Sequence, residues 1–194
     1  MRRFLSQRGF TLIELIVVVA IIGILASIVY ANLGNTSAAG RDTKRKSDLR
    51  NIQTAIEAYK QKIGRYPAMG CSTGADGFSG EDDCSDFISG LAPEFISRLP
   101  HDPKRSTNVG YAYVTNSAGS VYKLMAMNTV ESETVTYASE FKSCDTSVIC
   151  TTSGSGVCSP SNSRYQKSYA VWGGYADGDT DVAVKNSTAN IICK

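Results

Sequence analysis

Few residues of this chain have the type and spacing that catalysis or metal binding requires. His101 is the only histidine, and no nucleophile motif accompanies it, so a catalytic triad is untenable. Asp177, Asp179 and Asp181 alternate as the carboxylates of calcium loops do, but the later glycine and glutamate positions of an EF-hand do not match. The three aspartates are therefore weak metal candidates, and a polar turn is the simpler interpretation. The sequence predicts neither an enzyme nor a cofactor.

The six cysteines are better explained as disulfides than as metal ligands. They contain no CxxC pair, which argues against a zinc site, and their number is even. Disulfides place the domain in an oxidising space outside the cytoplasm. The one pairing we predict is Cys71–Cys84, which would close a loop rich in glycine, serine and aspartate; the connectivity of the others stays open. The six are Cys71, Cys84, Cys144, Cys150, Cys158 and Cys193.

Glu14 is the ionisable residue with the most unusual surroundings. It is the only charge between Phe10 and Ala31, a segment that would be about 33 Å long as a helix and could cross the roughly 30 Å core of a bilayer. Ionisable groups in membrane segments are expensive, so they usually have partners and functions. Because Glu14 lies near the start of the segment, it can approach the membrane interface in a free chain.

Two ordinary interpretations of this segment leave Glu14 unexplained. A secretory signal would have a basic start at Arg2, Arg3 and Arg8. It could be cleaved after Val29–Ala31, but its apolar part would exceed the usual length of about 7–15 residues. An uncleaved signal anchor is the second interpretation. Basic residues flank the segment on both sides, so charge alone leaves its orientation ambiguous, whereas the cysteines place the C-terminal side outside.

The stretch RGFTLIE, residues 8–14, resembles the class III signal of type IV pilins and pseudopilins. This resemblance implies that residues 1–9 are a leader and that a prepilin peptidase cuts between Gly9 and Phe10. The same enzyme would then methylate the new amino terminus of Phe10, and Glu14 corresponds to the family's glutamate. The resemblance further implies a subunit that polymerises with copies of itself through its N-terminal helix, with the help of pilus assembly machinery.

The environment of a helix bundle supports a role for Glu14 in assembly. Water is excluded from a bundle of apolar helices, so a carboxylate there needs a cation. Cleavage would create one, the amino group of Phe10. The chain's own helix holds that group too far along the axis for a direct bond, whereas a neighbouring subunit shifted along the axis could supply it. The alternative is a Glu14 that is satisfied at the interface without such a partner.

One long helix must present these residues. No proline occurs between Met1 and Tyr66, Gly64 fits a C-cap, and Pro67 prevents continuation, so we predict a helix from Thr11 to Lys62. Its second half has apolar residues at spacings of three and four, which form one face of an amphipathic helix against a sheet of the same chain. These residues are Leu49, Ile52, Ile56, Tyr59 and Ile63.

Two parts of this helix have a special composition. Gly34 and Gly40 each cost about 1 kcal/mol relative to alanine, so the helix is expected to be weak there and to bend or lose helical bonds when the subunit packs. The charged cluster that follows is expected to be a solvated helix face. It comprises Arg41, Asp42, Lys44, Arg45, Lys46, Asp48 and Arg50.

The rest of the chain predicts an α+β head, with the long helix against a small antiparallel sheet and disulfide-tied loops. Residues 109–115 and 120–129 alternate as strands around a turn and predict a β-hairpin. Residues 134–141 could be a third strand. The weaker strand candidates are 168–174, 180–185 and 190–194, and one or two short helical turns are expected within 85–100.

The head also resembles the major pseudopilin of type II secretion. The residues that carry this resemblance are Tyr66-Pro67, Gly90-Leu91, Leu99-Pro100, Asp102-Pro103, Tyr111, Tyr113, Tyr122 and Leu124. Two features depart from that pseudopilin, the cysteine loop 71–84 and the long C-terminal region with four more cysteines. They favour a surface-exposed pilin.

We therefore expect a structural subunit of a type IV pilus-like filament. Its parts would be the leader 1–9, the membrane and assembly part of the helix 10–31, the amphipathic part 32–63 and the head 64–194. It would cross the membrane once before assembly, with the head outside the cytoplasm, and then join an extracellular filament. The alternatives are a type II secretion pseudopilin, a minor tip pilin with an adhesive or DNA-binding head, and a membrane-anchored binding domain that keeps its leader. The net charge of +2 does not indicate a nucleic acid partner.

Overall fold

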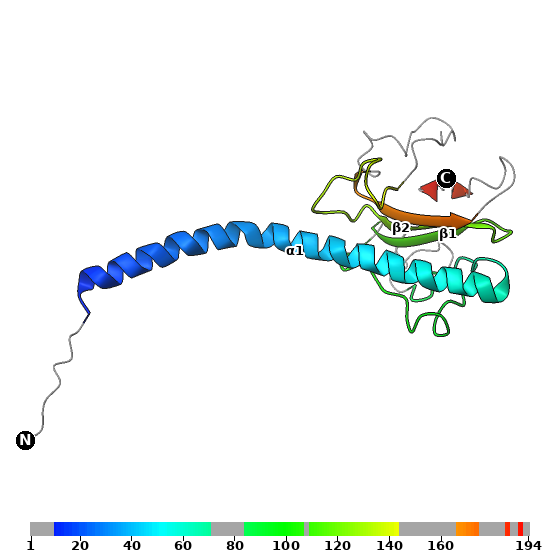
Figure 1. Cartoon of the computed structure of the whole chain (residues 1–194), viewed down its shortest axis with the longest axis horizontal. Coiled ribbons are helices and arrows are strands. Elements are labelled where there is room, and N and C mark those ends of the chain that lie inside the picture. The colour runs from blue at the N-terminus through cyan, green and yellow to red at the C-terminus, as the bar shows by residue number, and fades with distance from the viewer. Residues whose placement is uncertain are drawn as a thin grey trace, which may run out of the picture. The chain divides into compact units, whose positions relative to one another are not determined.

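The computed structural model describes residues 10–70, 84–106, 109–143, 166–174, 185–186 and 190–191, without the side chains of the last two pairs or of residues 29, 31–33 and 35. The chain divides into two compact units, Met1–Ala38 and Ala39–Lys194, and each is described by itself. Its elements in chain order are α1 (Leu12–Ile63), β1 (Gly110–Thr115), β2 (Val121–Met127), β3 (Tyr169–Gly174), β4 (Lys185–Asn186) and β5 (Asn190–Ile191) (Figure 1).

Helix α1 confirms the predicted long helix to within a residue at each end. At its C-terminal end Gly64 has a φ of +88°, and its N–H donates to the carbonyl of Lys60 at 2.8 Å. Glycine adopts this left-handed conformation without the steric cost that a Cβ would add, so Gly64 is the predicted cap. Within the part of the chain that the structure describes, no helix has the length and hydropathy needed to cross a membrane.

The head contains an antiparallel sheet with the strand order β1-β2-β3, and β4 pairs with β5 separately. Tyr113 lies opposite Leu124 in the β1–β2 pair, and Leu124 lies opposite Val171 in the β2–β3 pair. This register confirms the predicted hairpin and the strand predicted at 168–174. Strand β5 lies within the predicted strand 190–194, whereas residues 180–184 lie outside the described residues.

The main core lies between the second half of α1 and one face of the sheet. Leu49, Ile52 and Ile56 of the helix are fully buried in the same cluster as Tyr111 and Tyr122 of the sheet. This arrangement confirms that the amphipathic face of the helix packs on a sheet of its own chain. The prediction is wrong at Ile63, which is 48 % exposed at the end of the helix. The other face of the sheet is buried as well, with a smaller cluster of Ala112, Val114, Met125, Met127 and Ala170.

The buried tyrosine hydroxyls all reach an acceptor. Tyr111 donates to Asp48 Oδ2 at 2.7 Å, Tyr113 donates to the carbonyl of Pro67 at 2.8 Å, and Tyr122 donates to Glu57 Oε1 at 3.0 Å. Because a buried hydroxyl without a partner is costly, these bonds fix the tilt of the sheet tyrosines against α1. Two of the acceptors are carboxylates of α1 itself.

Lys123 of β2 is buried on the second face of the sheet. Its place in the alternating pattern of the strand does not indicate that a charged side chain is buried there. Its side chain is 1 % exposed, its Nζ donates to the carbonyl of Ser143, and it lies 5.8 Å from the ring centre of Trp172. Burial lowers the pKa of Lys123 to about 7. The amine is therefore held largely by one carbonyl and an aromatic ring.

The predicted third strand at 134–141 is wrong, because this segment forms turns. The N–H of Thr136 donates to Ser139 Oγ, and the N–H of Ser139 donates to the carbonyl of Thr136, both at 3.0 Å. Such local bonds occupy groups that a strand would use in a ladder. The helical turns expected in 85–100 are represented by two backbone bonds. The N–H of Phe95 donates to the carbonyl of Leu91 at 3.0 Å, the spacing of an α-helix, and the N–H of Leu91 donates to the carbonyl of Ile88 at 3.4 Å, the spacing of a 3₁₀ turn.

Candidate functional site

The first turn of α1 holds Glu14 in a capping box with Thr11. Glu14 Oε2 accepts hydrogen bonds from the N–H and from the hydroxyl of Thr11, both at 2.8 Å. In return the N–H of Glu14 donates to Thr11 Oγ1 at 3.3 Å, and the N–H of Leu15 makes the first helical bond to the carbonyl of Thr11. A threonine at the N-cap and a glutamate three residues later satisfy two helix-end donors reciprocally.

This geometry satisfies Glu14 within its own chain, as in the alternative that the sequence left open. The carboxylate thus has partners before any second subunit approaches. Phe10 is 89 % exposed next to it, and Gly9 lies outside the described residues. The cleavage between Gly9 and Phe10, the methylation of Phe10 and the pairing of Glu14 with a neighbour's amino group stay predictions.

Replacing Thr11 by alanine is expected to loosen the first turn of α1, because both side-chain bonds of the box are lost. Loss of a threonine cap corresponds to an increase of about 2- to 30-fold in amide hydrogen exchange at residues 14–15. Exchange is measured on the full chain in detergent micelles. Thr11→Ser keeps the hydroxyl and should exchange like the wild type, and Ser27→Ala, which removes a hydroxyl bonded to the carbonyl of Ile24 at 2.7 Å, is the matched control. Equal exchange in all variants would contradict the cap.

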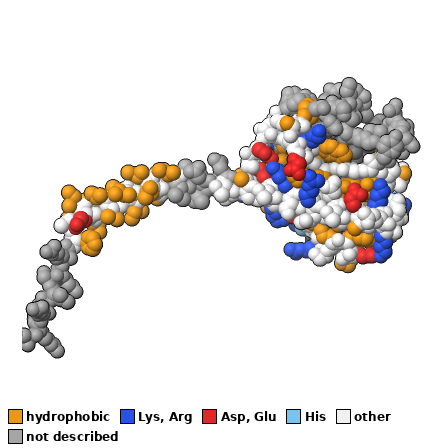
Figure 2. All heavy atoms as spheres, in the orientation of Figure 1, with side chains coloured by type: hydrophobic (Ala, Val, Ile, Leu, Met, Phe, Trp, Pro, Cys, Tyr) orange, Lys and Arg blue, Asp and Glu red, His pale blue; other side chains and the backbone are white. Residues whose placement is uncertain are grey.

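The first unit exposes apolar side chains all round its helix. The large hydrophobic residues from Phe10 to Tyr30 whose side chains are described are each at least 50 % exposed. Figure 2 shows these side chains covering the helix that follows Glu14. A helix that is apolar on every side is normally buried in a membrane or in protein. Among the described residues of the chain, none covers this apolar surface.

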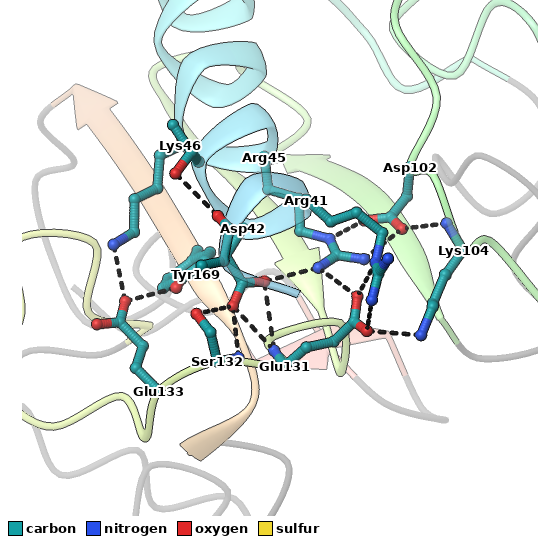
Figure 3. Close-up of polar contacts among 12 residues, drawn as sticks. Arg41, Asp42, Arg45, Lys46, Asp102, Lys104, Glu131, Ser132, Glu133 and Tyr169 are labelled. Atoms are coloured by element: carbon teal, nitrogen blue, oxygen red, sulfur yellow. Dashed lines mark hydrogen bonds and ion pairs between the residues drawn. The ribbon is translucent and has the colours of Figure 1, made fainter. Parts of the chain in front are cut away.

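Arg45 is the centre of a second group of polar residues, which lies in the head unit (Figure 3). Its guanidinium is 0 % exposed and binds Asp102 with two bonds, Nε to Oδ2 at 2.7 Å and Nη2 to Oδ1 at 3.1 Å. Nη1 also donates to Asp42 Oδ1 at 2.6 Å and to Glu131 Oε1 at 3.0 Å. We name this group the Arg45 cluster; it comprises Arg41, Asp42, Arg45, Asp102, Lys104, Glu131 and Ser132.

Glu131 joins three cations of the Arg45 cluster. Arg41 donates to it from Nε at 2.8 Å and from Nη2 at 2.6 Å, and Lys104 Nζ donates at 2.5 Å, in addition to the bond from Arg45. The bonds from Arg41 hold the pKa of Glu131 well below its usual range, and those from Lys104 and Arg45 add to this effect. Glu131 therefore remains ionised across the physiological range.

Asp42 connects the helix to the backbone of the loop that contains Glu131. Burial alone would raise the pKa of Asp42, but bonds from Ser132 outweigh it, so the pKa is lowered. The N–H and hydroxyl of Ser132 donate at 2.7 and 2.6 Å, and the N–H of Glu131 donates at 3.0 Å. These bonds tie the first turn of the helix in the head unit to a loop far away in the sequence.

The predicted solvated helix face is wrong at Arg45, Asp42 and Asp48, which are 0 %, 2 % and 9 % exposed. The prediction remains adequate for Lys44 and Arg50, whose side chains are about half exposed at 51 % and 50 %. The signal that could have located the cluster is weak. Asp42 precedes Arg45 by three residues, which is compatible with a local pair on any helix surface.

Acid is expected to destabilise the head, because Asp42 and Glu131 of the Arg45 cluster have lowered pKa values in the folded state. A carboxyl group of this kind contributes stability that is complete above its unfolded pKa and is lost as the pH falls through the folded pKa. For Glu131 the loss should begin near its ordinary value of 4.5 and continue below it. Urea midpoints between about pH 7 and pH 2 test this, and Glu131→Gln should reduce the slope. An identical slope in the variant would contradict the assignment.

The remaining candidate residues of the sequence form no reactive site in the described chain. His101 Nδ1 lies 3.1 Å from Arg105 Nη1 in a partly exposed loop, a contact that does not correspond to a catalytic triad. Among the described residues no three acidic, histidine or cysteine side chains are placed to hold a metal ion, and Asp177, Asp179 and Asp181 lie outside them. The close pairing of carboxylates with guanidinium groups makes the Arg45 cluster a structural network rather than a metal site.

Cys84 is the one cysteine among the described residues. It is 3 % exposed and disulfide-bonded. The other five cysteines lie outside the described residues, so the pairing of Cys71 with Cys84 and the remaining connectivity stay predictions.

Comparison with known families places the N-terminal segment in a defined class. Residues 5–30 match the family model described as the prokaryotic N-terminal methylation motif. This match covers Phe10, Thr11 and Glu14 and includes the start of the exposed apolar helix.

Several curated proteins are similar to about half of this chain. The type II secretion system core protein G of Klebsiella pneumoniae is 41% identical over 100 residues, which cover 50% of this chain and 69% of that protein. The core protein G of Klebsiella michiganensis is 52% identical over 109 residues, covering 50% and 68%. The type IV major pilin protein PilA of Myxococcus xanthus is 35% identical over 114 residues, covering 58% and 43%. No solved structure matches the chain.

Proposed function

We propose, because this chain belongs to the type IV pilin and pseudopilin family, that it is a non-enzymatic structural subunit of a filament and acts as a pseudopilin of a type II secretion system. The observation that carries the filament role is the prepilin motif on a helix whose apolar side chains are exposed on all sides. Apolar area left in water would cost about 25 cal/mol for each Å², so this surface needs lipid before assembly and copies of the same helix after it.

The relatives support the pseudopilin more than the surface pilus that the cysteine pattern favours. The two core proteins G are 41% and 52% identical and are covered over more than two thirds of their length. A surface pilus is the second candidate. The similarity to the pilin PilA supports it, although this chain covers only 43% of that protein.

In this proposal the chain is made as a precursor and inserted in the membrane through the apolar half of its helix. A prepilin peptidase removes residues 1–9 and methylates Phe10. The amino group of Phe10 in one subunit then pairs with Glu14 in the next, which replaces the local bonds to Thr11. The head lies outside the cytoplasm, in keeping with the disulfide of Cys84.

The processing step is tested by mass spectrometry of the mature amino terminus. The chain is expressed with and without a prepilin peptidase. The proposal expects a chain that begins at N-methylated Phe10 only when the peptidase is present, and a Gly9→Ala precursor provides the matched uncleaved control. A mature protein that begins at Met1 in the presence of the peptidase would contradict the proposal that the processed chain is a filament subunit.

The choice between pseudopilin and pilus is tested by comparing the host cell with a strain that lacks this chain. Loss of exoprotein secretion in the deletion strain, with few sheared surface fibres that contain this chain in the parent, supports the pseudopilin. Abundant surface fibres that contain this chain, with normal secretion after the deletion, would favour the pilus instead.

A further inference from the structure

The first two turns of α1 in the head unit have no apolar side chain with which to join the core. Residues 41–48 are Arg, Asp, Thr, Lys, Arg, Lys, Ser and Asp, and the first apolar core residue is Leu49, which is 0 % exposed. The boundary between the two compact units lies just before this stretch, between Ala38 and Ala39. Polar contacts therefore decide where the helix becomes part of the head.

The buried polar contacts of this stretch are those of the Arg45 cluster and, at its far end, the bond that Tyr111 donates to Asp48 at 2.7 Å. Arg45 and Asp102 have side chains that are 0 % exposed, whereas Lys46 and Glu133 form a pair that is 37 % and 43 % exposed. Exposed pairs contribute little because water and salt screen them, whereas a buried cation loses heavily if its carboxylates move away. The anchor of this stretch is thus the Arg45 guanidinium.

The cluster joins the helix to two separate loops of the head, as the close-up shows (Figure 3). Asp102 is 57 residues from Arg45 along the chain, and Glu131 is 86 residues from it. Displacement of the helix at Arg45 would therefore break bonds to both loops at once. A connection of this kind favours two discrete states of the helix, bound to both loops or released from both, over a gradual displacement.

The helix just before the cluster has little to support it. Apart from their own helix backbone and chain neighbours, Gly34 and Gly40 have no atom within 4 Å of the place a Cβ would occupy. Glycine is also the weakest helix former after proline. Thr36 and Ser37 are exposed. The helical hydrogen bonds in this stretch therefore cost less free energy to open than those that follow Arg45.

We propose that the Arg45 cluster is a clamp that sets the residue from which α1 is fixed to the head. Helical bonds before Arg41 can open while those from Arg45 onward stay closed. This inference deepens the proposed function. It rests on the proposed function in one respect: a subunit that leaves the membrane for a filament must repack the apolar half of its helix without unfolding its head. The clamp would confine that change to the residues before Arg41.

Amide hydrogen exchange on the full chain in detergent micelles tests the clamp. The quantity measured is the protection of the amides of residues 45–48 divided by that of Ile52 and Ile56, so that any change in global stability cancels. In the wild type the ratio should be close to one. In Arg45→Met it should fall at least tenfold, since the first firm anchors become Asp48, which is bonded to Tyr111, and Leu49. Arg50→Met is the matched control, because its pair with Glu140 is exposed, and it should keep the wild-type ratio.

An unchanged ratio in Arg45→Met would overturn the clamp, and so would a fall of the same size in Arg50→Met. If Arg45→Met does not fold, Asp102→Asn, which keeps the shape of the side chain and removes its charge, is measured instead with the same expected fall. The exchange experiment needs neither cleavage nor filaments. A precursor that is never processed would therefore refute the proposed function while leaving the result for the clamp unaffected.

Discussion

Filaments are expected to be lost when Glu14 is replaced by glutamine or alanine in a chain that is the only subunit available. The physical reason is that the processed amino terminus of Phe10 would carry a positive charge into a bundle of apolar helices, where a charge without a partner is strongly unfavourable. In the single chain Glu14 is satisfied by the N–H and the hydroxyl of Thr11 at 2.8 Å. The variant should therefore still fold and still be processed.

Fibres are sheared from cells or from a reconstituted assembly system and quantified by immunoblot. Mass spectrometry of the same samples checks that the variant begins at N-methylated Phe10. Ser27→Ala is the control, because it alters a polar group of the same helix that bonds only to the carbonyl of Ile24 in the described contacts. Fibres in normal amount from either Glu14 variant would refute the pairing between neighbouring subunits.

Replacing Arg45 by methionine is expected to lower the free energy of unfolding of the head by about 3–5 kcal/mol. The substitution leaves Asp42, Asp102 and Glu131 close together without the guanidinium that they share. Buried carboxylates that lose their cation are destabilised by desolvation and by mutual repulsion. The stability of the head should therefore depend far more on this one residue than on any exposed charge.

Urea unfolding of the full chain in mild detergent, with disulfides intact, measures this effect. Trp172 is the only tryptophan and packs against the second cluster of the sheet, so its fluorescence reports the folding of the head. Arg50→Met removes an exposed pair with Glu140 and should cost only about 0–1 kcal/mol. A similar loss in both variants, or no loss in Arg45→Met, would show that the cluster does not hold the head together.

The elements of the fold that depend on neighbouring residues could be predicted from the sequence. The limits of α1 follow from the absence of proline and from Gly64, whose left-handed φ of +88° ends the helix. The β1–β2 hairpin follows from alternation around a short turn, and its register brings Tyr113 opposite Leu124 as a meander requires. The segment 134–141 shows the limit of this approach, because local bonds between Thr136 and Ser139 prevail over its strand-like composition.

The candidate functional residues likewise divide into those that the sequence indicated and those that only the structure located. By itself the sequence determined the prepilin motif and the position of Glu14 in an apolar helix, because both are local patterns within a few turns. The capping box of Thr11 and Glu14 was not predicted from the sequence, and the structure shows its bonds in both directions.

Only the tertiary structure decided the state of Arg45. The charged composition of residues 41–50 predicted that Arg45 is a solvated surface charge. Its partners Asp102 and Glu131 are 57 and 86 residues away, and no local pattern indicates that they approach it. The same holds for Lys123, whose burial depends on what covers the second face of the sheet. The physical reason is common to both. Whether a charge is solvated or buried depends on chain segments that meet only when the core has formed, whereas helix limits, caps and turns depend on bonds between near neighbours.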